Sequence, residues 1–397
     1  MDIYERALAR HEETRGKIEV RSRMRLETQD DLSMAYTPGV ARPCEEIAKD
    51  ASRAWDLTWK GRTVAVVSDG SSVLGLGDIG PAASLPVMEG KAALFHEFAG
   101  LDAVPVVLDA RDPQEIIDIV KAISPTFGGI NLEDISAPRC FEIEDALQDI
   151  GIPVLHDDQH GTAIVLLAAV MNASRVLNTS LGNMSVVLNG AGAAGRAICN
   201  LLLCKDTSEA CIPVGKMRVC DSKGVIWPGR PGNTPMKEEI AQLTNPDGEQ
   251  GFLRDAIVGA NVFIGVSRGG LLKAEDIKTM GKDPIVLAMA NPVPEIMPDE
   301  AVAGGAAIVG TGRSDFPNQV NNVLAFPGLF RGALEARALK FTTGMKFAAI
   351  HAITGCVEEP TPKRILPSPF DRSVAVRVAE EVAAAAVRNG VCFEQAK

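Results

Sequence analysis

A glycine-rich turn between an apolar strand and an apolar helix constrains this chain more than any other feature. Residues 185–189 read SVVLN, residues 190–195 read GAGAAG, and the segment that follows has helical spacing. This is G-x-G-x-x-G in the strand–turn–helix context of a nucleotide-binding βαβ unit, where the glycines let the backbone approach a pyrophosphate. The start of the helix supplies N–H donors for the same group. We therefore predict a dinucleotide site, rather than a purely structural turn, that contains Gly190, Gly192, Ala193, Ala194 and Gly195.

The strand that follows this turn ends in a carboxylate. The segment MRVCD ends at Asp221, where an acidic side chain can accept hydrogen bonds from ribose hydroxyls, which favours NAD. Ser222 and Lys223 come next and can accommodate a 2′-phosphate, so NADP is the open alternative. Residues 206–215 look like an inserted loop, which explains why the spacing from the glycines is longer than usual. Without a nucleotide role, Asp221 would be a turn residue at a strand end.

Short apolar runs alternate with amphipathic segments over most of the chain. Strands are expected at residues 63–69, 103–109, 128–134 and 152–158, and a second series begins at residue 185. Such alternation predicts mainly parallel sheets covered on both faces. A long apolar helix after residue 160 would link the two series. The expected fold class is α/β, with two domains (residues 1–160 and 161–397), the second of Rossmann type, and with helical additions at the N- and C-termini.

Composition and charge exclude several kinds of partner. The formal net charge of −11 and the lack of a basic run argue against nucleic acid. The longest apolar run, residues 163–171, is far shorter than the roughly 20 residues that cross a bilayer, so no membrane association is expected. The charged N-terminus does not resemble a secretory signal. None of the eight cysteines forms a C-x-x-C pair, so we expect reduced thiols, no disulfide and no zinc site in a cytoplasmic protein.

Two pairs of acidic residues end consecutive predicted strands. Glu133 and Asp134 close GGINLED, and Asp157 and Asp158 close IPVLHDD. Strand carboxyl ends line the ligand crevice of an open α/β sheet, and carboxylates that converge there repel one another unless a cation lies between them. Oxygen ligands suit Mg²⁺ or Mn²⁺. The alternative is that these residues are solvated strand caps. His156 and His160 flank the second pair, where local hydrogen bonding is a simpler expectation than catalysis.

Six blocks together resemble the malic enzymes, in their shorter bacterial form. In chain order they read YTPGVA (residues 36–41), VLGLGDIGPAASLPVMEGKAALF (73–95), INLEDI (130–135), HDDQHGTA (156–163), GAGAAG (190–195) and NQVNNVLAFPG (318–328). The resemblance extends from about Tyr36 to Gly332, and several long blocks in one order are far more specific than any single motif.

The resemblance implies roles for individual residues. Lys91, in the PVMEGK segment, matches the family's general base, and Tyr36, in YTP, matches its general acid. The base must work near neutral pH, and a neighbouring metal and a cationic nicotinamide ring can lower the pKa of a lysine for that purpose. The other implied positions are the metal ligands Glu133, Asp134 and Asp158, the neighbouring Asp157, the substrate and cofactor contact Asn291, and the substrate contact Asn322.

One position departs from the family pattern. Longer members carry an arginine before LGLG that binds a substrate carboxylate, whereas this chain has Ser72 there. Backbone N–H groups or the metal would then have to hold that carboxylate.

The implied reaction is oxidative decarboxylation of (S)-malate to pyruvate and CO₂, with reduction of NAD or NADP and with Mg²⁺ or Mn²⁺. A malolactic enzyme or an oxaloacetate decarboxylase on the same scaffold is the main alternative. A nicotinamide-sensing regulator is disfavoured because Tyr36, Lys91 and every metal carboxylate are retained. The resemblance also implies a homodimer in which the Tyr36 segment reaches the partner subunit's site.

Overall fold

The computed structural model describes residues 2–73, 75–205, 207 and 211–393. Its first sheet has four parallel strands in the order β2-β1-β3-β4, with Val64 of β1 paired to Ala103 on one side and to Gly129 on the other. The strands are β1 (Thr63–Ser68), β2 (Asp102–Val107), β3 (Gly129–Leu132) and β4 (Val154–His156). The helices between them are α5 (Pro81–Ala99), α6 (Pro113–Ile123) and α7 (Arg139–Ala146). Asp112 caps α6 by accepting hydrogen bonds from the backbone N–H groups of Gln114 and Glu115, as expected for an aspartate before a first-turn proline.

The second sheet has six strands in the order β10-β9-β8-β5-β6-β7, and all its neighbours are parallel except the short β6–β7 pair. Its strands are β5 (Ser185–Asn189), β6 (Lys216–Asp221), β7 (Gly224–Val225), β8 (Val262–Gly265), β9 (Ile285–Ala288) and β10 (Ile308–Thr311). The accompanying helices are α9 (Ala193–Leu202), α10 (Pro235–Thr244), α11 (Leu253–Ala256), α12 (Ala274–Ile277) and α13 (Pro298–Ala303). The prediction of an α/β fold with mainly parallel sheets and a Rossmann-type unit is confirmed.

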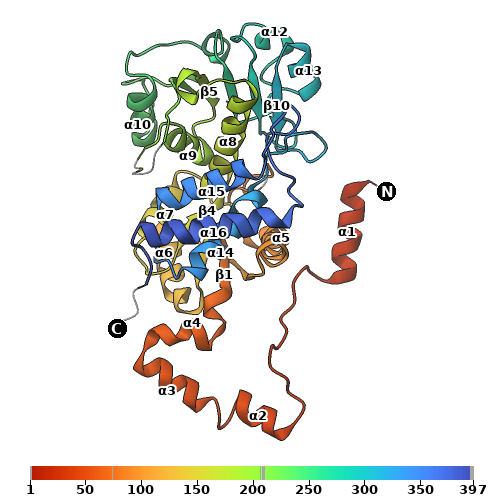
Figure 1. Ribbon diagram of the computed structural model, residues 1–397, viewed down its shortest axis with the longest axis vertical. Coiled ribbons are helices and arrows are strands. Elements are labelled where there is room, and N and C mark those ends of the chain that lie inside the picture. The colour runs from red at the N-terminus through yellow and green to blue at the C-terminus, as the bar shows by residue number, and fades with distance from the viewer. Residues whose placement is uncertain (1, 74, 206, 208–210, 394–397) are drawn as a thin grey trace.

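A long helix, α8 (Asp157–Val176), runs from the end of the first sheet toward the second (Figure 1). Its residues from Ala163 to Val170 are all buried, because a helix that is apolar on every face has to be covered on every face. α8 packs against α9 and also against α15 (Thr343–Gly355). The predicted domain division after residue 160 falls within the first turns of this helix, and it stays a prediction.

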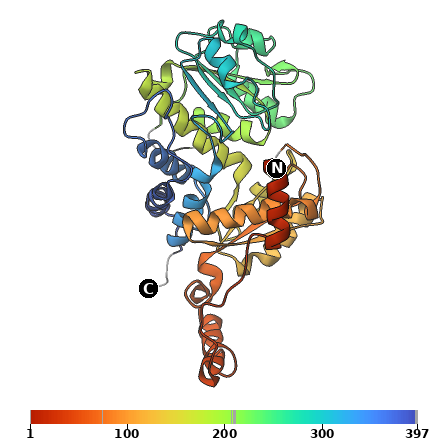
Figure 2. The same cartoon turned by 90° about the vertical axis from the view of Figure 1, so that its right-hand side faces the viewer.

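Helices from the C-terminal part of the chain return to the first sheet (Figures 1 and 2). They are α14 (Phe326–Glu335), α15 and α16 (Arg372–Arg388). Phe326 and Phe330 of α14 each make edge contacts with Phe95 of α5, with ring centroids 4.8 and 5.4 Å apart. These ring contacts pack α14 against α5, the helix that carries Lys91.

The N-terminal part of the chain forms an arm that extends away from both sheets at α2 and α3 and touches α5 at Lys17, whose Nζ donates to the carbonyl oxygen of Pro86 at 2.7 Å (Figures 1 and 2). It contains α1 (Ile3–Thr14), α2 (Gln29–Ala35), α3 (Ala41–Lys49) and α4 (Ala54–Leu57), and none of these helices has a buried residue. Exposed apolar side chains are frequent along it, for example Val20 at 90% and Met34 at 55% exposure. Apolar surface of this extent on an extended segment is typical of a region that packs against another molecule.

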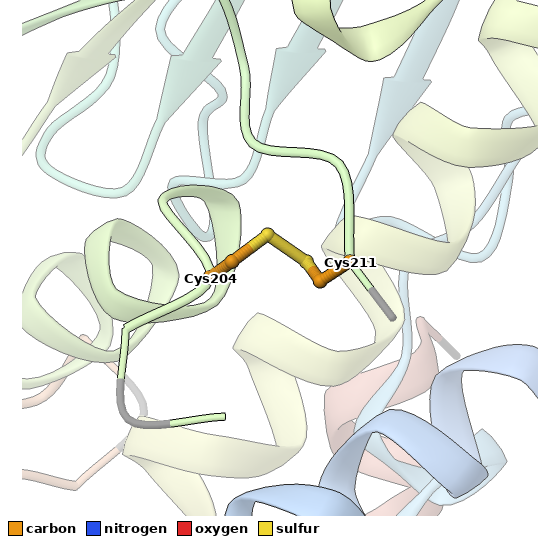
Figure 3. Close-up of a disulfide and its surroundings, with 2 residues drawn as sticks. All are labelled: Cys204 and Cys211. Carbon is orange, nitrogen blue, oxygen red and sulfur yellow. A yellow bond between two sulfur atoms is a disulfide. The ribbon is translucent and has the colours of Figure 1, made fainter. Parts of the chain in front are cut away.

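The expectation that all cysteines are reduced is wrong for one pair. Cys204 and Cys211 form a disulfide, with their Cα atoms 5.9 Å apart (Figure 3). Cys204 lies directly after α9 and has a positive φ of 55°. The other six cysteines are free, and three of them, Cys140, Cys199 and Cys220, are buried as expected. In the part of the chain that the structure describes, no helix is long and apolar enough to cross a membrane.

Candidate active site

The three predicted metal ligands meet at the carboxyl ends of β3 and β4. Oxygen atoms of Glu133, Asp134 and Asp158 all lie within 4.8 Å of one another. Glu133 and Asp134 are buried, and the side chain of Asp158 is 35% exposed. The backbone N–H of Asp134 donates to Oδ2 of Asp158 at 2.8 Å, which ties the two strand ends together. The parallel order of β3 and β4 therefore produces the convergence that the two acidic pairs predicted.

The charges of this cluster fit a divalent cation. Burial raises the pKa of Glu133 well above its usual value; Lys91 opposes the shift, and the carboxylates of Asp158, Asp157 and Asp134 add to it. Several carboxylates thus lie close together, and their mutual repulsion favours a cation between them. The available donors are all oxygen atoms, which is the ligand set that Mg²⁺ and Mn²⁺ prefer.

Lys91 is buried next to the cluster. Its Nζ is 2.6 Å from Oδ2 of Asp157 and 2.8 Å from Oε1 of Glu133, and it lies 4.2 Å from the centre of the Phe326 ring. Burial favours a lower pKa for Lys91, but the charges and hydrogen bonds of Asp157 and Glu133 outweigh burial and raise it. The pKa of Lys91 is thus raised, whereas a metal and a cationic ring beside a lysine would lower its pKa. The reason is that Asp157 and Glu133, the two groups next to the ammonium, are anions.

Asp157 connects Lys91 to a second predicted residue, Asn322. The Nδ2 of Asn322 donates to Oδ2 of Asp157 at 3.1 Å, and Thr162 donates to Oδ1 of Asn322 at 3.0 Å. Residue 161 must be a glycine for this arrangement, since a Cβ there would come within 2.0 Å of Oδ1 of Asp157. The C-terminal part of the chain, through Asn322, thus joins the site built by the first sheet.

Asn291 lies in a turn after β9 that faces the loop after β1. A Cβ added at Gly75 would come within 2.9 Å of the carbonyl oxygen of Asn291. The carboxyl ends of the two sheets therefore approach each other where Asn291 was predicted to contact substrate and cofactor. Ser72, in the same loop after β1, donates its backbone N–H to the carbonyl oxygen of Asp134 at 2.9 Å, so this position borders the carboxylate cluster.

Of the predicted catalytic residues Tyr36, Lys91 and Asp157, Tyr36 alone lies away from the carboxylate cluster. It follows α2 on the N-terminal arm, and its side chain is 68% exposed. Figures 1 and 2 both show α2 at the far end of the arm, well away from α5 and β4.

The glycine turn has the geometry expected of a pyrophosphate-binding loop. Gly190 has a φ of 125°, and a Cβ there would come within 2.6 Å of the carbonyl oxygen of Val266. A Cβ at Gly195 would come within 2.0 Å of the carbonyl oxygen of Gly190, whereas one at Gly192 would meet no atom within 4 Å. The outer glycines thus allow close backbone packing, and Gly192 leaves an open approach to the first turn of α9.

Asp221, at the end of β6, is held by two cations that sequence reasoning missed. Arg230 donates to both of its carboxylate oxygens, at 3.0 and 2.5 Å, and Lys237 donates to Oδ2 at 2.7 Å. Burial favours a higher pKa for Asp221, but these hydrogen bonds outweigh burial and lower the pKa well below its usual value. Asp221 is therefore a fixed anion in a net positive surrounding, and both cations come from the chain after β7, where no motif marked them.

The chain is similar to known proteins over nearly its whole length. The model for the malic enzyme N-terminal domain matches residues 15–148, and the model for the malic enzyme NAD-binding domain matches residues 159–387. A bifunctional malic/malolactic enzyme of Bacillus subtilis is 53% identical over 395 residues, which cover 98% of this chain and 95% of that protein. An NAD-dependent malic enzyme of Geobacillus stearothermophilus is 55% identical over 95% of this chain and 78% of its own length. The crystal structure of malic enzyme from Pyrococcus horikoshii is 44% identical, covers 100% of this chain and 93% of its own, and superimposes with a TM-score of 0.92.

Proposed function

This chain belongs to the malic enzyme family of NAD- or NADP-dependent oxidoreductases, and we propose that it oxidises and decarboxylates (S)-malate to pyruvate and CO₂ with the help of a divalent metal ion. The observation that carries the proposal is the position of Lys91, buried between Asp157 and Glu133 beside the other carboxylates. A base for the substrate hydroxyl and a set of oxygen ligands for a cation thus share one site, as hydroxy-acid oxidation with decarboxylation requires.

The chemistry can be divided among this chain's residues. Glu133, Asp134 and Asp158 would hold Mg²⁺ or Mn²⁺, which would polarise the C2 oxygen and stabilise the enolate left by CO₂. The glycine turn and Asp221 would hold the dinucleotide, which would supply the acceptor for the hydride of C2. Lys91 takes the proton of the substrate hydroxyl. It must first be neutral, and Asp157, at 2.6 Å, is within hydrogen-bond distance to exchange a proton with it. Asn291 and Asn322 would orient the substrate.

The proposal includes a homodimer in which Tyr36 acts at the partner subunit's site, where it protonates C3 of the enol directly or together with Lys91. The exposed apolar side chains of the arm and the distance of Tyr36 from its own chain's cluster both support this arrangement. A second copy of the chain that packed against the arm would bury this apolar surface and complete two sites at once.

Malolactic conversion is the second candidate, because the Bacillus subtilis relative is named as a bifunctional malic/malolactic enzyme. In that case the reduced dinucleotide would stay bound and lactate would be released. Both NAD and NADP fit the surroundings of Asp221. The carboxylate of Asp221 favours ribose hydroxyls, and the cations beside it favour a 2′-phosphate.

The proposal assigns the enzyme to the cytoplasm. Free buried thiols agree with a reducing compartment, whereas the Cys204–Cys211 disulfide is a feature that a reducing compartment does not explain.

The test is to incubate the protein with L-malate, Mn²⁺ and either NAD or NADP, and to measure reduced-nicotinamide absorbance, pyruvate and lactate in one tube. Reduced cofactor and pyruvate in equal amounts are expected. Lactate without net reduced cofactor would establish the malolactic reaction instead. No consumption of malate with either dinucleotide would overturn the proposal.

A further inference from the structure

One buried carboxylate near the site has no part in the proposed chemistry. Glu144, on α7, is only 6% exposed and lies on a different element from the predicted ligands. It accepts a hydrogen bond from the backbone N–H of His156 at 3.0 Å and from Nε2 of Gln159 at 2.9 Å. It also accepts one from Nε2 of His160, at 3.0 Å from one carboxylate oxygen and 3.1 Å from the other.

These donors flank the two acidic residues of the site on both sides. His156 precedes Asp157 and Asp158 along the chain, and Gln159 and His160 follow them. His156 is the N-cap residue of α8, but its side chain makes no capping hydrogen bond. Glu144 therefore supplies from outside the helix the polar contacts that fix this turn.

The network continues beyond Glu144 to the C-terminal helices. Nζ of Lys346, on α15, lies 3.0 Å from Nδ1 of His160. It also lies 3.4 Å from Nε2, so the imidazole of His160 lies between the side chains of Lys346 and Glu144. α7, α8 and α15 are thereby joined through one chain of polar contacts.

The turn that Glu144 holds leads directly to a predicted metal ligand. The His156 side chain is fully buried, and its Nε2 lies 3.6 Å from Oδ2 of Asp158. The same Oδ2 accepts the backbone N–H of Asp134. A change in the position of His156 or Gln159 would thus move Asp158 relative to Asp134 and Glu133.

We propose that Glu144 is a positioning residue, which fixes the turn between β4 and α8 so that Asp158 meets Glu133 and Asp134 while Asp157 meets Lys91. The inference rests on the proposed function in one respect: the carboxylate cluster must bind a divalent cation. Residues that orient metal ligands in this way typically account for about 10- to 100-fold in metal affinity.

The experiment measures the Mn²⁺ dissociation constant of the full-length protein by electron paramagnetic resonance of free Mn²⁺. Glu144→Gln keeps the shape of the side chain but turns half of the carboxylate into an N–H donor facing other donors. We expect Mn²⁺ to bind at least about tenfold more weakly to this variant. Glu142→Gln is the matched control, because Glu142 lies on the same helix and is exposed, and it should bind Mn²⁺ like the wild type.

Each outcome separates this inference from the proposed function. Equal Mn²⁺ affinity in folded Glu144→Gln and wild-type protein would overturn the inference and leave the proposed function intact. No Mn²⁺ binding by the wild type would remove the metal from the proposed function, and this inference with it. A merely structural role would lower the melting temperature and leave the dissociation constant unchanged. Should Glu144→Gln fail to fold, His160→Asn, which removes one donor, must weaken Mn²⁺ binding severalfold, and unchanged affinity in that folded variant would also overturn the inference.

Discussion

Lys91 and Asp157 form a buried ion pair in which the ammonium nitrogen lies 2.6 Å from the carboxylate Oδ2. The pair joins two elements distant in sequence, since Lys91 lies in the middle of α5 and Asp157 is the first residue of α8. Asp157 thus positions Lys91 and lies within reach of its proton.

Replacement of Lys91 by alanine is expected to lower kcat by about a thousandfold, the size of a general-base contribution, while dinucleotide binding persists. The base acts on malate, whereas the glycine turn lies on the other sheet. Steady-state rates and a fluorescence titration with reduced dinucleotide would measure the two effects. Lys121→Ala, an exposed lysine on α6, is the matched control. Turnover near that of the wild type in Lys91→Ala would refute the base assignment.

Removal of divalent cations by a chelator is expected to stop malate oxidation, and added Mn²⁺ should restore it. The carboxylates of Glu133, Asp134 and Asp158 converge within 4.8 Å, and their repulsion is relieved by a cation. Dinucleotide binding, followed by fluorescence, serves as the control and should survive chelation. Full activity after dialysis against chelator would contradict the metal proposal.

Mixed dimers test whether Tyr36 acts in trans. Tyr36→Phe and Lys91→Ala proteins should each be inactive alone, because each lacks one proton-transfer group. Subunit exchange between them would create dimers with one doubly altered and one intact site, so about a quarter of wild-type activity is expected for random pairing in a symmetric dimer. Refolded mixtures that stay inactive, while refolded wild type recovers, would show that Tyr36 does not serve the partner's site.

Glycine 161 offers a steric test of the position of Asp157. A Cβ at Gly161 would approach Oδ1 of Asp157 to 2.0 Å, so Gly161→Ala must displace this carboxylate from Lys91. A fall in kcat of about a hundredfold is expected, within the range of acid–base contributions. Gly90→Ala, beside Lys91 on α5, is the control because a Cβ there meets no atom within 4 Å. Equal activities of the two variants would indicate that Asp157 need not be held in this position.

The acid sensitivity of the fold should depend on Glu144. Burial favours a higher pKa for Glu144, but the charges and hydrogen bonds of His160 and Lys346 outweigh burial and lower the pKa to about 2. A carboxylate with a depressed pKa stabilises the folded state above its unfolded pKa, and this stabilisation is lost as the pH falls from about 4.5 toward 2. Urea unfolding should therefore show wild type more stable than Glu144→Gln by up to about 3 kcal/mol at pH 7 and by much less near pH 2. A difference independent of pH would contradict this assignment.

The local parts of the site could be predicted from residue spacing, whereas distant residues such as Lys91 and Asn322 could be predicted only from the resemblance to a family. The glycine turn and the pairs Glu133–Asp134 and Asp157–Asp158 each lie within a few residues of one strand end, so a reading of strands and turns located them. Arg230 and Glu144 reach the site region from other elements, and their contacts depend on packing that no spacing encodes. The disulfide between Cys204 and Cys211 was missed as well, since no C-x-x-C spacing marked these two cysteines.

Helix α8 gives the two sheets a mechanical connection. Its 20 residues form a rod about 30 Å long, and most of that rod is buried between α9 and α15. Asp157 and Asp158 lie at one end of the rod, and β5 with its glycine turn follows the other end. One rigid element therefore carries the two aspartates and leads into the nucleotide-binding sheet, so any displacement of α8 would reach the carboxylate cluster and the start of that sheet together.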